Sequence, residues 1–257
     1  MTMNSADNPV LTIDDIAVSY GGDPVISGLS TTFERGTLVG LIGPNGAGKT
    51  TLMLSAAGQF RPVRGHVYFE GRDVYEHNRD FKRRIGYVHE DPFFYPYLTA
   101  EDFLRFVAGV KSVPEDDMES QIHTLLELVD LSGEKDKVTS ALSMGMRKKL
   151  AIAAAMVGKP RILFLDEALN GIDIESTYRI KSSLREFVTG GGAIILSTHT
   201  LEVVEKVCDR YLLLKEGRVI ADLKADEAAG QRDVEEAGGL EQYVIQLLSA
   251  PDDADRQ

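Results

Sequence analysis

The fold is decided by residues 37–51, which read Thr37-Leu-Val-Gly-Leu-Ile-Gly43-Pro44-Asn45-Gly46-Ala47-Gly48-Lys49-Thr50-Thr51. Residues 37–42 are a short apolar run typical of a buried strand in a parallel sheet, and a helical pattern begins near Lys49. Residues 43–50 match the pattern G-x-x-x-x-G-K-[ST]. The glycines let the backbone turn its N–H groups toward phosphate oxygens, and the helix directs its positive N-terminus to the same place. A strand, a phosphate-binding loop and a helix are therefore predicted.

This loop assigns roles to individual residues. Lys49 is expected to reach the β- and γ-phosphates of a nucleoside triphosphate, and Thr50 is expected to offer its hydroxyl to Mg²⁺. Further contacts to the nucleotide are expected from Gly43, Pro44, Asn45, Gly46, Ala47, Gly48 and Thr51. A nucleoside triphosphate with Mg²⁺ is therefore the expected cofactor.

Two acidic residues end a second apolar run, Arg161-Ile-Leu-Phe-Leu-Asp166-Glu167. Acids at the carboxyl edge of a parallel sheet lie beside the phosphate loop. Asp166 is expected to hold Mg²⁺, directly or through water, and Glu167 to orient and polarise the water that attacks in line. The alternative is that both acids only cap the next helix, but the phosphate loop in the same chain favours the first interpretation.

Short strands and helices alternate along the rest of the chain. The middle is helical: Thr99 is a predicted helix cap, Pro114 opens the next helix, and a third helix follows Ser143 to about Val157. Expected strands cover residues 11–19, 25–34, 66–69, 85–88, 162–165, 193–197 and 211–214, and expected helices cover 175–188 and 201–207. This order predicts an α/β protein with a mostly parallel sheet and helices on its faces.

Further motifs surround the two sites in a fixed order. They are Tyr20, Leu142-Ser143-Met144-Gly145-Met146, Asn170-Gly-Ile-Asp173 and Ser197-Thr-His199. Together with the phosphate loop and the acid pair, they resemble the ATP-binding subunit of an ABC transporter over about residues 10–222. In that family they correspond to an adenine-stacking aromatic, the signature, the D-loop and the switch histidine. ATP then becomes the expected nucleotide.

The resemblance also implies an architecture. The expected fold is a P-loop NTPase with a RecA-like core sheet, an N-terminal antiparallel β subdomain and an inserted helical subdomain. The ATP-binding domain would cover residues 1–222, with the helical subdomain at about 91–157, and a C-terminal helical extension with an acidic tail would cover 223–257. The apolar helical face at 240–248 would pack on its own core or pair protomers, and both interpretations remain open.

Roles for the remaining motif residues follow from the resemblance. Tyr20 would stack on adenine, with core or turn packing as the alternative. Ser143 and Gly145 would address the γ-phosphate of an ATP molecule held by the other protomer, so that ATP joins a homodimer or pseudo-symmetric dimer. Asp173 would help to align the partner's site. His199 would hydrogen-bond the γ-phosphate or the water-orienting region, unless it is only a surface histidine.

Two positions depart from the family pattern. Glu90 stands where the family usually has a glutamine that reaches Mg²⁺ and the attacking water. A carboxylate is a competent Mg²⁺ ligand, so Glu90 is expected to keep a metal-side role with an altered Mg²⁺ dependence. In the signature, Met144 and Met146 replace the common Gly and Gln. This S-x-G-M form resembles the type-2 exporter branch, which favours export by analogy.

An aromatic segment directly follows Glu90. It reads Asp91-Pro-Phe93-Phe94-Tyr95-Pro-Tyr97. In the family this region lines the groove that receives the permease. Exposed aromatics suit such an interface, and packing against the chain's own helical subdomain is an equally weighted alternative.

Composition limits the partners. Lys and Arg number 28 against 40 Asp and Glu, a formal charge of −12, which argues against direct binding to nucleic acid or to an anionic lipid surface. No secretory or transit signal and no spanning segment is recognised. The expected partner is therefore a separate transmembrane permease, and the expected location is cytoplasmic, peripheral on the inner face of the membrane. The single cysteine, Cys208, is expected to be a small packing residue in a reduced compartment.

Other functions explain these motifs less completely than a transport ATPase does. A non-transport ABC ATPase, such as a cluster-assembly subunit, remains an alternative. A small-molecule kinase would not explain the signature or His199. An inactive regulator is disfavoured because Lys49, Asp166, Glu167 and His199 are all present.

Overall fold

A computed structural model describes residues 9–199, 201–228, 234 and 237–249. Its central sheet contains β3 (Leu38–Ile42), β6 (Ile85–Val88), β7 (Ile162–Asp166), β8 (Ala193–Ser197), β9 (Arg210–Lys215) and β10 (Arg218–Lys224). The strand order is β10-β9-β3-β8-β7-β6, and every neighbouring pair is parallel except β10 with β9. The predicted mostly parallel α/β sheet is confirmed.

A second, antiparallel sheet comes mainly from the N-terminal part of the chain. It contains β1 (Leu11–Val18), β2 (Ile26–Phe33), β4 (Arg64–Phe69) and the short β5 (Arg72–Asp73), in the order β2-β1-β4-β5. Helix α1 (Lys49–Ala56) contacts strands of both sheets, and its Leu52 and Met53 are buried in the core between them. The phosphate loop is therefore supported from two sides.

Two apolar cores lie on opposite faces of the central sheet. Because successive strand residues point to opposite faces, Phe164 of β7 enters the core shared with the antiparallel sheet, while Leu163 and Leu165 enter the core shared with the helices. Strands β3, β7 and β8 are buried at every position, as expected for parallel strands covered on both faces.

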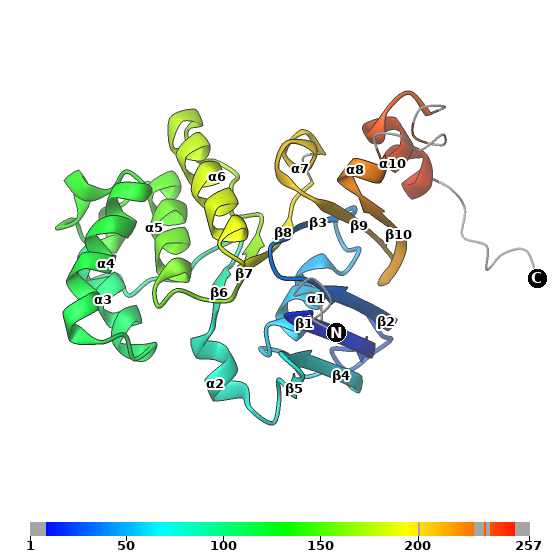
Figure 1. Ribbon diagram of the computed structural model, residues 1–257, viewed down its shortest axis with the longest axis horizontal. Coiled ribbons are helices and arrows are strands. Elements are labelled where there is room, and N and C mark those ends of the chain that lie inside the picture. Colours follow the sequence, from blue (N-terminus) through cyan, green and yellow to red (C-terminus); the bar gives the residue numbers. More distant parts are fainter. Residues whose placement is uncertain (1–8, 200, 229–233, 235–236, 250–257) are drawn as a thin grey trace, which may run out of the picture.

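The helical subdomain lies at one end of the molecule (Figure 1). It contains α3 (Ala100–Val110), α4 (Glu115–Leu128), α5 (Met144–Met156) and two short 3₁₀ turns, Ser132–Glu134 and Thr139–Ala141. Thr99 caps α3 by accepting a hydrogen bond from the backbone N–H of Asp102, and Ser143 caps α5 through the N–H of Met146. Both caps were predicted, because Ser and Thr satisfy N–H groups that the first helical turn leaves free.

The remaining helices are α2 (Asn78–Arg83), α6 (Ile174–Thr189), α7 (Leu201–Val207), α8 (Ala225–Ala228) and α10 (Leu240–Ser249). The sequence did not predict α2, α8, β5 or β10, which are short or lie at a sheet edge. The expected domain boundary at 222 falls inside β10. Cys208 is buried against the sheet, as expected of a packing residue.

The C-terminal helix α10 packs on its own chain. Val244 is buried in the larger core, and the other apolar side chains of this face are partly buried against it: Leu240, Tyr243, Leu247 and Leu248. Of the two interpretations left open for this face, the structure therefore contains packing on the chain's own core. The acidic tail after Ser249 lies outside the described residues.

Candidate functional site

A cavity of about 530 Å³ opens at the carboxyl ends of β3 and β7. Its lining residues are Tyr20, Val25, Asn45, Gly46, Gly48, Lys49, Thr50, Thr51, Glu90, Asp166, Glu167 and His199. Apart from Val25, every one of them was predicted as a site residue from the sequence. Topology explains why residues so distant in the chain meet, since parallel strands deliver their carboxyl ends to one edge.

The phosphate loop has a backbone that depends on glycine. Gly46 and Gly48 have φ values of +80° and +99°, in the left-handed region. A Cβ at Gly48 would lie 2.7 Å from Cδ1 of Ile26, and one at Gly43 would lie 2.2 Å from the carbonyl oxygen of Leu214. Close backbone approach therefore requires glycine at position 43, the Ile26 side chain also leaves no room for a Cβ at position 48, and the positive φ favours glycine at positions 46 and 48.

Helix α1 starts at the floor of the cavity without a side-chain cap. Its first N–H groups are therefore available to an anion. The Lys49 ammonium donates hydrogen bonds to the carbonyl oxygens of Gly43 (2.7 Å) and Pro44 (3.1 Å), so the lysine is held inside the curl of the loop.

Burial lowers the pKa of Lys49 below the ordinary lysine value. The nearby carboxylates of Glu167, Asp166 and Glu90 act in the opposite direction, because they favour the charged ammonium. A triphosphate would add negative charge on the same side. The site therefore places one buried cation where an anionic ligand strengthens its charged form.

Asp166 is the more deeply buried acid of the pair. Its Oδ1 accepts a short hydrogen bond from the Ser197 hydroxyl, and its Oδ2 accepts a weak one from the Tyr87 hydroxyl at 3.5 Å. Burial, with a contribution from the Asp166 charge, raises the pKa of Tyr87, so this phenol stays a proton donor. Asp166 is thus oriented by two neighbours.

The donors present suit Mg²⁺ bound together with a nucleotide. Thr50 and Asp166 supply a hydroxyl and a carboxylate to the same cavity. In the part of the chain that the structure describes, no group of three or more His, Cys, Asp or Glu side chains could hold a metal ion by itself. Phosphate oxygens and water would therefore complete the ligand set, as is usual for Mg²⁺.

Glu167 is held from several directions. Its backbone φ of +48° is unusual for a residue with a side chain. Its Oε2 accepts a hydrogen bond from the Asn170 amide at 2.7 Å, and its Oε1 lies 3.2 Å from Nδ1 of His199. The Glu167 N–H reaches Oγ of Ser197 at 3.2 Å. The whole residue is only 9% exposed, yet it lines the cavity, so its carboxylate is preorganised and still accessible to a small reactant.

Tyr20 stands at the outer edge of the cavity. Its ring packs at 4.6 Å between centroids on Phe60, and its hydroxyl lies 3.3 Å from Oγ1 of Thr51. The residue remains 57% exposed. It therefore combines turn packing with an exposed surface beside the phosphate loop, where an adenine ring could stack.

The signature and D-loop residues with predicted roles lie outside this cavity. Among the described residues that line the cavity, Ser143, Gly145 and Asp173 do not occur. Ser143 caps α5, and Asp173 caps α6 by accepting a hydrogen bond from the Ser176 N–H at 2.8 Å. A Cβ on Gly145 would lie 2.9 Å from the carbonyl oxygen of Gly171, which brings the two motifs side by side. One chain thus contains two spatially separate sets of predicted site residues.

Several residues at the site had no role predicted from the sequence. Tyr87, Asn170 and Ser197 hold the two acids through side-chain hydrogen bonds. Ser197 is the first residue of the switch motif that the sequence revealed, at the carboxyl end of β8. Tyr87 has no signal of its own, because its role depends on β6 pairing with β7.

The aromatic segment that follows Glu90 contains both buried and exposed rings, so each of the two predicted interpretations applies to different side chains. Phe94 is buried against Phe103, and the Arg147 guanidinium lies 5.6 Å from its ring centroid. In contrast, Phe93 and Tyr97 are 77% and 90% exposed. Internal packing therefore holds the segment in place, while other rings of the same segment face outward.

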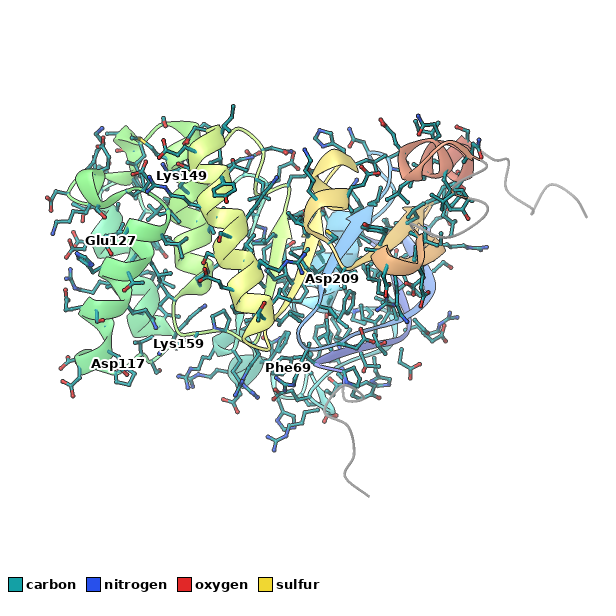
Figure 2. The ribbon with its side chains drawn as sticks, turned by 45° about the horizontal axis from the view of Figure 1, so that its top comes forward. Phe69, Asp117, Glu127, Lys149, Lys159 and Asp209 are labelled. Atoms are coloured by element: carbon teal, nitrogen blue, oxygen red, sulfur yellow. The ribbon has the colours of Figure 1, made fainter. Side chains whose placement is uncertain are left out.

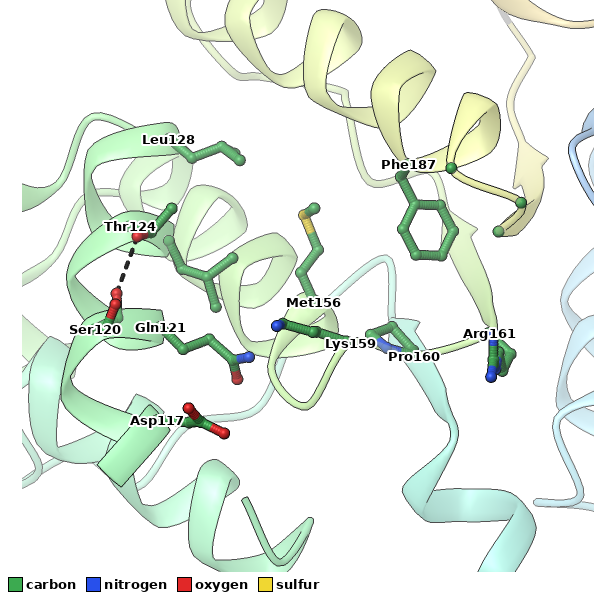
Figure 3. Close-up of a pocket in the computed structure, with 14 residues that line it drawn as sticks. Asp117, Ser120, Gln121, Thr124, Leu128, Met156, Lys159, Pro160, Arg161 and Phe187 are labelled. Carbon is green, nitrogen blue, oxygen red and sulfur yellow. Dashed lines mark hydrogen bonds between the residues drawn. The ribbon is translucent and has the colours of Figure 1, made fainter. Parts of the chain in front are cut away.

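A second cavity, of about 570 Å³, lies away from the predicted site (Figure 3). Residues from α4, from the end of α6 and from the turn after α5 line it, among them Asp117, Lys159 and Phe187. It lies at the boundary between the helical subdomain and the rest of the core. None of the predicted site residues borders it.

The fold and the first cavity define a P-loop nucleoside triphosphatase. Comparison with known proteins is more specific: the ABC transporter family model matches residues 26–170. The chain belongs to this family, as one of its ATP-binding, ATP-hydrolysing subunits. Within the described residues, no helix is long and apolar enough to cross a membrane.

Similar proteins agree with this assignment. The Nod factor export ATP-binding protein I of Rhizobium meliloti (strain 1021) is 35% identical over 248 residues, which cover 94% of this chain and 74% of the relative. The energy-coupling factor transporter ATP-binding protein of Methanothermobacter thermautotrophicus is 33% identical over 221 residues (83% and 70%). A solved ATP-binding subunit of an ABC transporter superposes with a TM-score of 0.85 at 28% identity, covering 93% of this chain and 99% of that one.

Proposed function

We propose that two copies of this chain, or one copy and a similar chain, bind ATP between them and use its hydrolysis to drive a separate membrane permease. The observation that carries this proposal is the separation of the two site-residue sets. Lys49 and Glu167 share one cavity, while Ser143 and Gly145 lie at the exposed start of α5. A helix N-terminus favours an anion. Ser143 and Gly145, however, do not line the cavity that contains the chain's own phosphate loop. A second protomer would supply that anion.

Each residue then has a role in hydrolysis. The phosphate loop and Lys49 hold the β- and γ-phosphates, Tyr20 stacks on adenine, and Thr50 and Asp166 hold Mg²⁺, with Glu90 on the metal side. Glu167 polarises the water that attacks the γ-phosphate in line. His199, 3.2 Å from Glu167, can donate to the γ-phosphate or keep the carboxylate oriented. Asp173 aligns the partner's site.

The direction of transport is proposed to be export. The S-x-G-M signature supports this direction, and the Rhizobium relative is named for export. The exposed Phe93 and Tyr97 offer the permease an apolar contact surface beside Glu90. The chain would then lie at the cytoplasmic face of the membrane, held there through the permease.

Three measurements test this function. First, the rate of ATP hydrolysis with Mg²⁺ should rise more steeply than in proportion to protein concentration, because the active unit is a pair. Second, Lys49→Ala should bind ATP about 10- to 100-fold more weakly, because it loses a charged hydrogen-bond donor. Affinity purification from membranes should recover a polytopic membrane protein. Recovery of a soluble scaffold instead would favour the cluster-assembly alternative, and full activity of an isolated monomer would contradict the paired site.

A further inference from the structure

The loop between β7 and α6 carries Glu167 at its start and Asp173 at its end. Helix α5, which begins directly after Ser143, touches this loop along its length. At the start of the loop, the Lys148 ammonium donates a hydrogen bond to the backbone carbonyl oxygen of Glu167 at 3.3 Å. The helix that bears the signature is thus bonded to the residue that bears the hydrolytic carboxylate.

Two more contacts continue along the loop. In its middle, Gly145 approaches Gly171 so closely that a Cβ would lie 2.9 Å from the carbonyl oxygen. At its end, Nζ of Lys149 lies 3.7 Å from Oδ2 of Asp173 and donates to Oγ of Ser176 at 2.9 Å. Figure 2 labels Lys149 between the helical subdomain and α6. The first turns of α5 therefore hold the loop at its start, middle and end.

Both lysines are buried, which requires a physical reason. Lys148 is 8% exposed and Lys149 is 5% exposed. Burying an ammonium is strongly unfavourable unless polar partners replace its hydration. Lys149 lies near carboxylates, at 3.5 Å from Asp130 and 3.7 Å from Asp173. Lys148 differs, because in the described part of the chain it forms no ion pair and donates to a backbone carbonyl instead.

The carbonyl that Lys148 holds belongs to the strained residue. Glu167 has a φ of +48°, and rotation of its backbone would swing the carboxylate away from His199 and Asn170. An ammonium on the carbonyl opposes that rotation. Movement of α5 would therefore be transmitted to the Glu167 carboxylate through one hydrogen bond.

We propose that Lys148 is a positioning residue for Glu167, and that together with Lys149 it couples the placement of the signature helix to the hydrolytic geometry of the same chain. This inference rests on the proposed function, because it assumes that Glu167 activates water. A signature that engages the partner's nucleotide would then also align its own chain's carboxylate. The two ATP sites of the pair would communicate through α5.

The variant Lys148→Met tests the proposal, and the chain offers a matched control. Lys111 is also a largely buried lysine that donates to backbone carbonyls, those of Ala155 (3.1 Å) and Val157 (2.8 Å), at the opposite end of α5. Lys111→Met therefore removes a similar interaction from the same helix without touching the loop. Both variants are measured for thermal unfolding, ATP affinity, kcat and KM.

Lys148→Met is expected to lower kcat about 10- to 100-fold while KM for ATP changes less than about twofold, because a misplaced carboxylate slows the chemical step without weakening nucleotide binding. Lys111→Met should lower the unfolding temperature but keep kcat near the parental value. Lys148→Arg, which retains a cationic donor, should recover most of the loss. Added to Glu167→Gln, Lys148→Met should lower the rate little further, since both changes act on one step.

Equal kcat values for Lys148→Met and Lys111→Met would overturn the proposal. A Lys148→Met variant that loses activity only through a higher KM for ATP would also overturn it. If Lys148→Met does not fold, Lys148→Gln, which keeps a shorter N–H donor, is compared with Lys111→Gln by the same criteria. The parent and Glu167→Gln separate the two levels of inference. If the parent hydrolyses ATP and Glu167→Gln does not, an unchanged kcat of Lys148→Met contradicts only the coupling. If the parent protein does not hydrolyse ATP, the proposed function itself fails.

Discussion

Helices α1 and α5 each begin at a motif for which the sequence predicts a contact with phosphate, and their N-termini differ in what surrounds them. Helix α1 starts without a side-chain cap inside a cavity that also holds Lys49, Asp166 and Glu167. Helix α5 starts with the Ser143 cap on the outside, and its first residue, Met144, is more than half exposed. The first terminus can hold a triphosphate with its own chain's groups. We propose that the second completes a site that another molecule brings to it.

This comparison teaches that a local phosphate-binding signal does not by itself indicate where the phosphate comes from. Both termini offer N–H groups and a favourable dipole. Among the described residues, α1 opens into the cavity that Lys49, Asp166 and Glu167 line, whereas Ser143 and Gly145 at the start of α5 do not line it. The expected effects of mutation should therefore differ in kind between the two termini, and the following tests are ordered from the largest expected effect to the smallest.

The largest effect is expected at the α1 cavity. Glu167→Gln should reduce the rate of hydrolysis about 10²–10⁴-fold while ATP still binds, because the amide keeps the shape of the side chain but cannot accept a proton. The trapped nucleotide should stabilise the dimer, which size-exclusion chromatography with ATP would detect. A Glu167→Gln protein that hydrolyses ATP at the parental rate would remove Glu167 from this role.

At the α5 terminus, Gly145→Asp should strongly weaken dimerisation and leave nucleotide binding by the monomer nearly intact. The new carboxylate would repel the partner's γ-phosphate, and its Cβ would press on the Gly171 carbonyl. Measured in the Glu167→Gln background, the ATP-dependent dimer should weaken about 100-fold or more, as expected for loss of a charge-assisted contact and its replacement by repulsion.

Gly133→Asp is the control for that test, since a Cβ at Gly133 meets no atom within 4 Å. Loss of ATP binding by the Gly145→Asp monomer would mean that the two termini belong to one site within a single chain, and the comparison would be wrong.

A smaller effect is expected at Glu90, on the rim of the α1 cavity. Glu90→Gln removes one negative charge beside Lys49 and Asp166 and restores the residue usual in the family. The Mg²⁺ concentration for half-maximal hydrolysis should shift about two- to fivefold, the size of a partly solvated charge interaction. The exposed Glu241→Gln on α10 is the charge-matched control. Superimposable Mg²⁺ curves for parent and Glu90→Gln would exclude a metal-side role.

The last expected effect is on stability and not on hydrolysis, and it concerns the far end of α5. Burial lowers the pKa of Lys111 to about 8, below its value of about 10.4 in an unfolded chain. Below pH 8 both states are protonated and the native state bears the cost of a buried charge. Between pH 8 and 10 only the unfolded chain keeps the proton, so the free energy of unfolding should rise with pH by on the order of 2 kcal/mol, relative to Lys111→Met.

Urea denaturation of parent and Lys111→Met across this pH range measures the difference between the two slopes. Identical slopes would show that Lys111 keeps an ordinary pKa in the folded chain. Hydrolysis per folded molecule should not follow this titration, because Lys111 lies outside the cavity that contains Lys49 and Glu167.

Much of the α1 cavity was predictable from the sequence. The loop at 43–50 combines glycine spacing, an apolar strand before it and a helix after it, so local chemistry alone identifies it. The acid pair at 166–167 follows a buried strand, and the sheet brings it to the loop. Tyr87 was not predictable, because its contact with Asp166 depends on the pairing of β6 with β7. The edge strand β10 was missed because its alternation is weak and its residues are mostly exposed.

The sequence by itself determined the class of fold, the phosphate loop, the acid pair and the caps of α3 and α5, because each depends on residues close together in the chain. The tertiary structure alone decided that Phe94 is buried while Phe93 is exposed, that α10 packs on its own core, and that Lys148 reaches the Glu167 carbonyl. These outcomes depend on which elements become neighbours in space. Local propensity carries no information about such contacts, since they arise only when strands pair and helices pack.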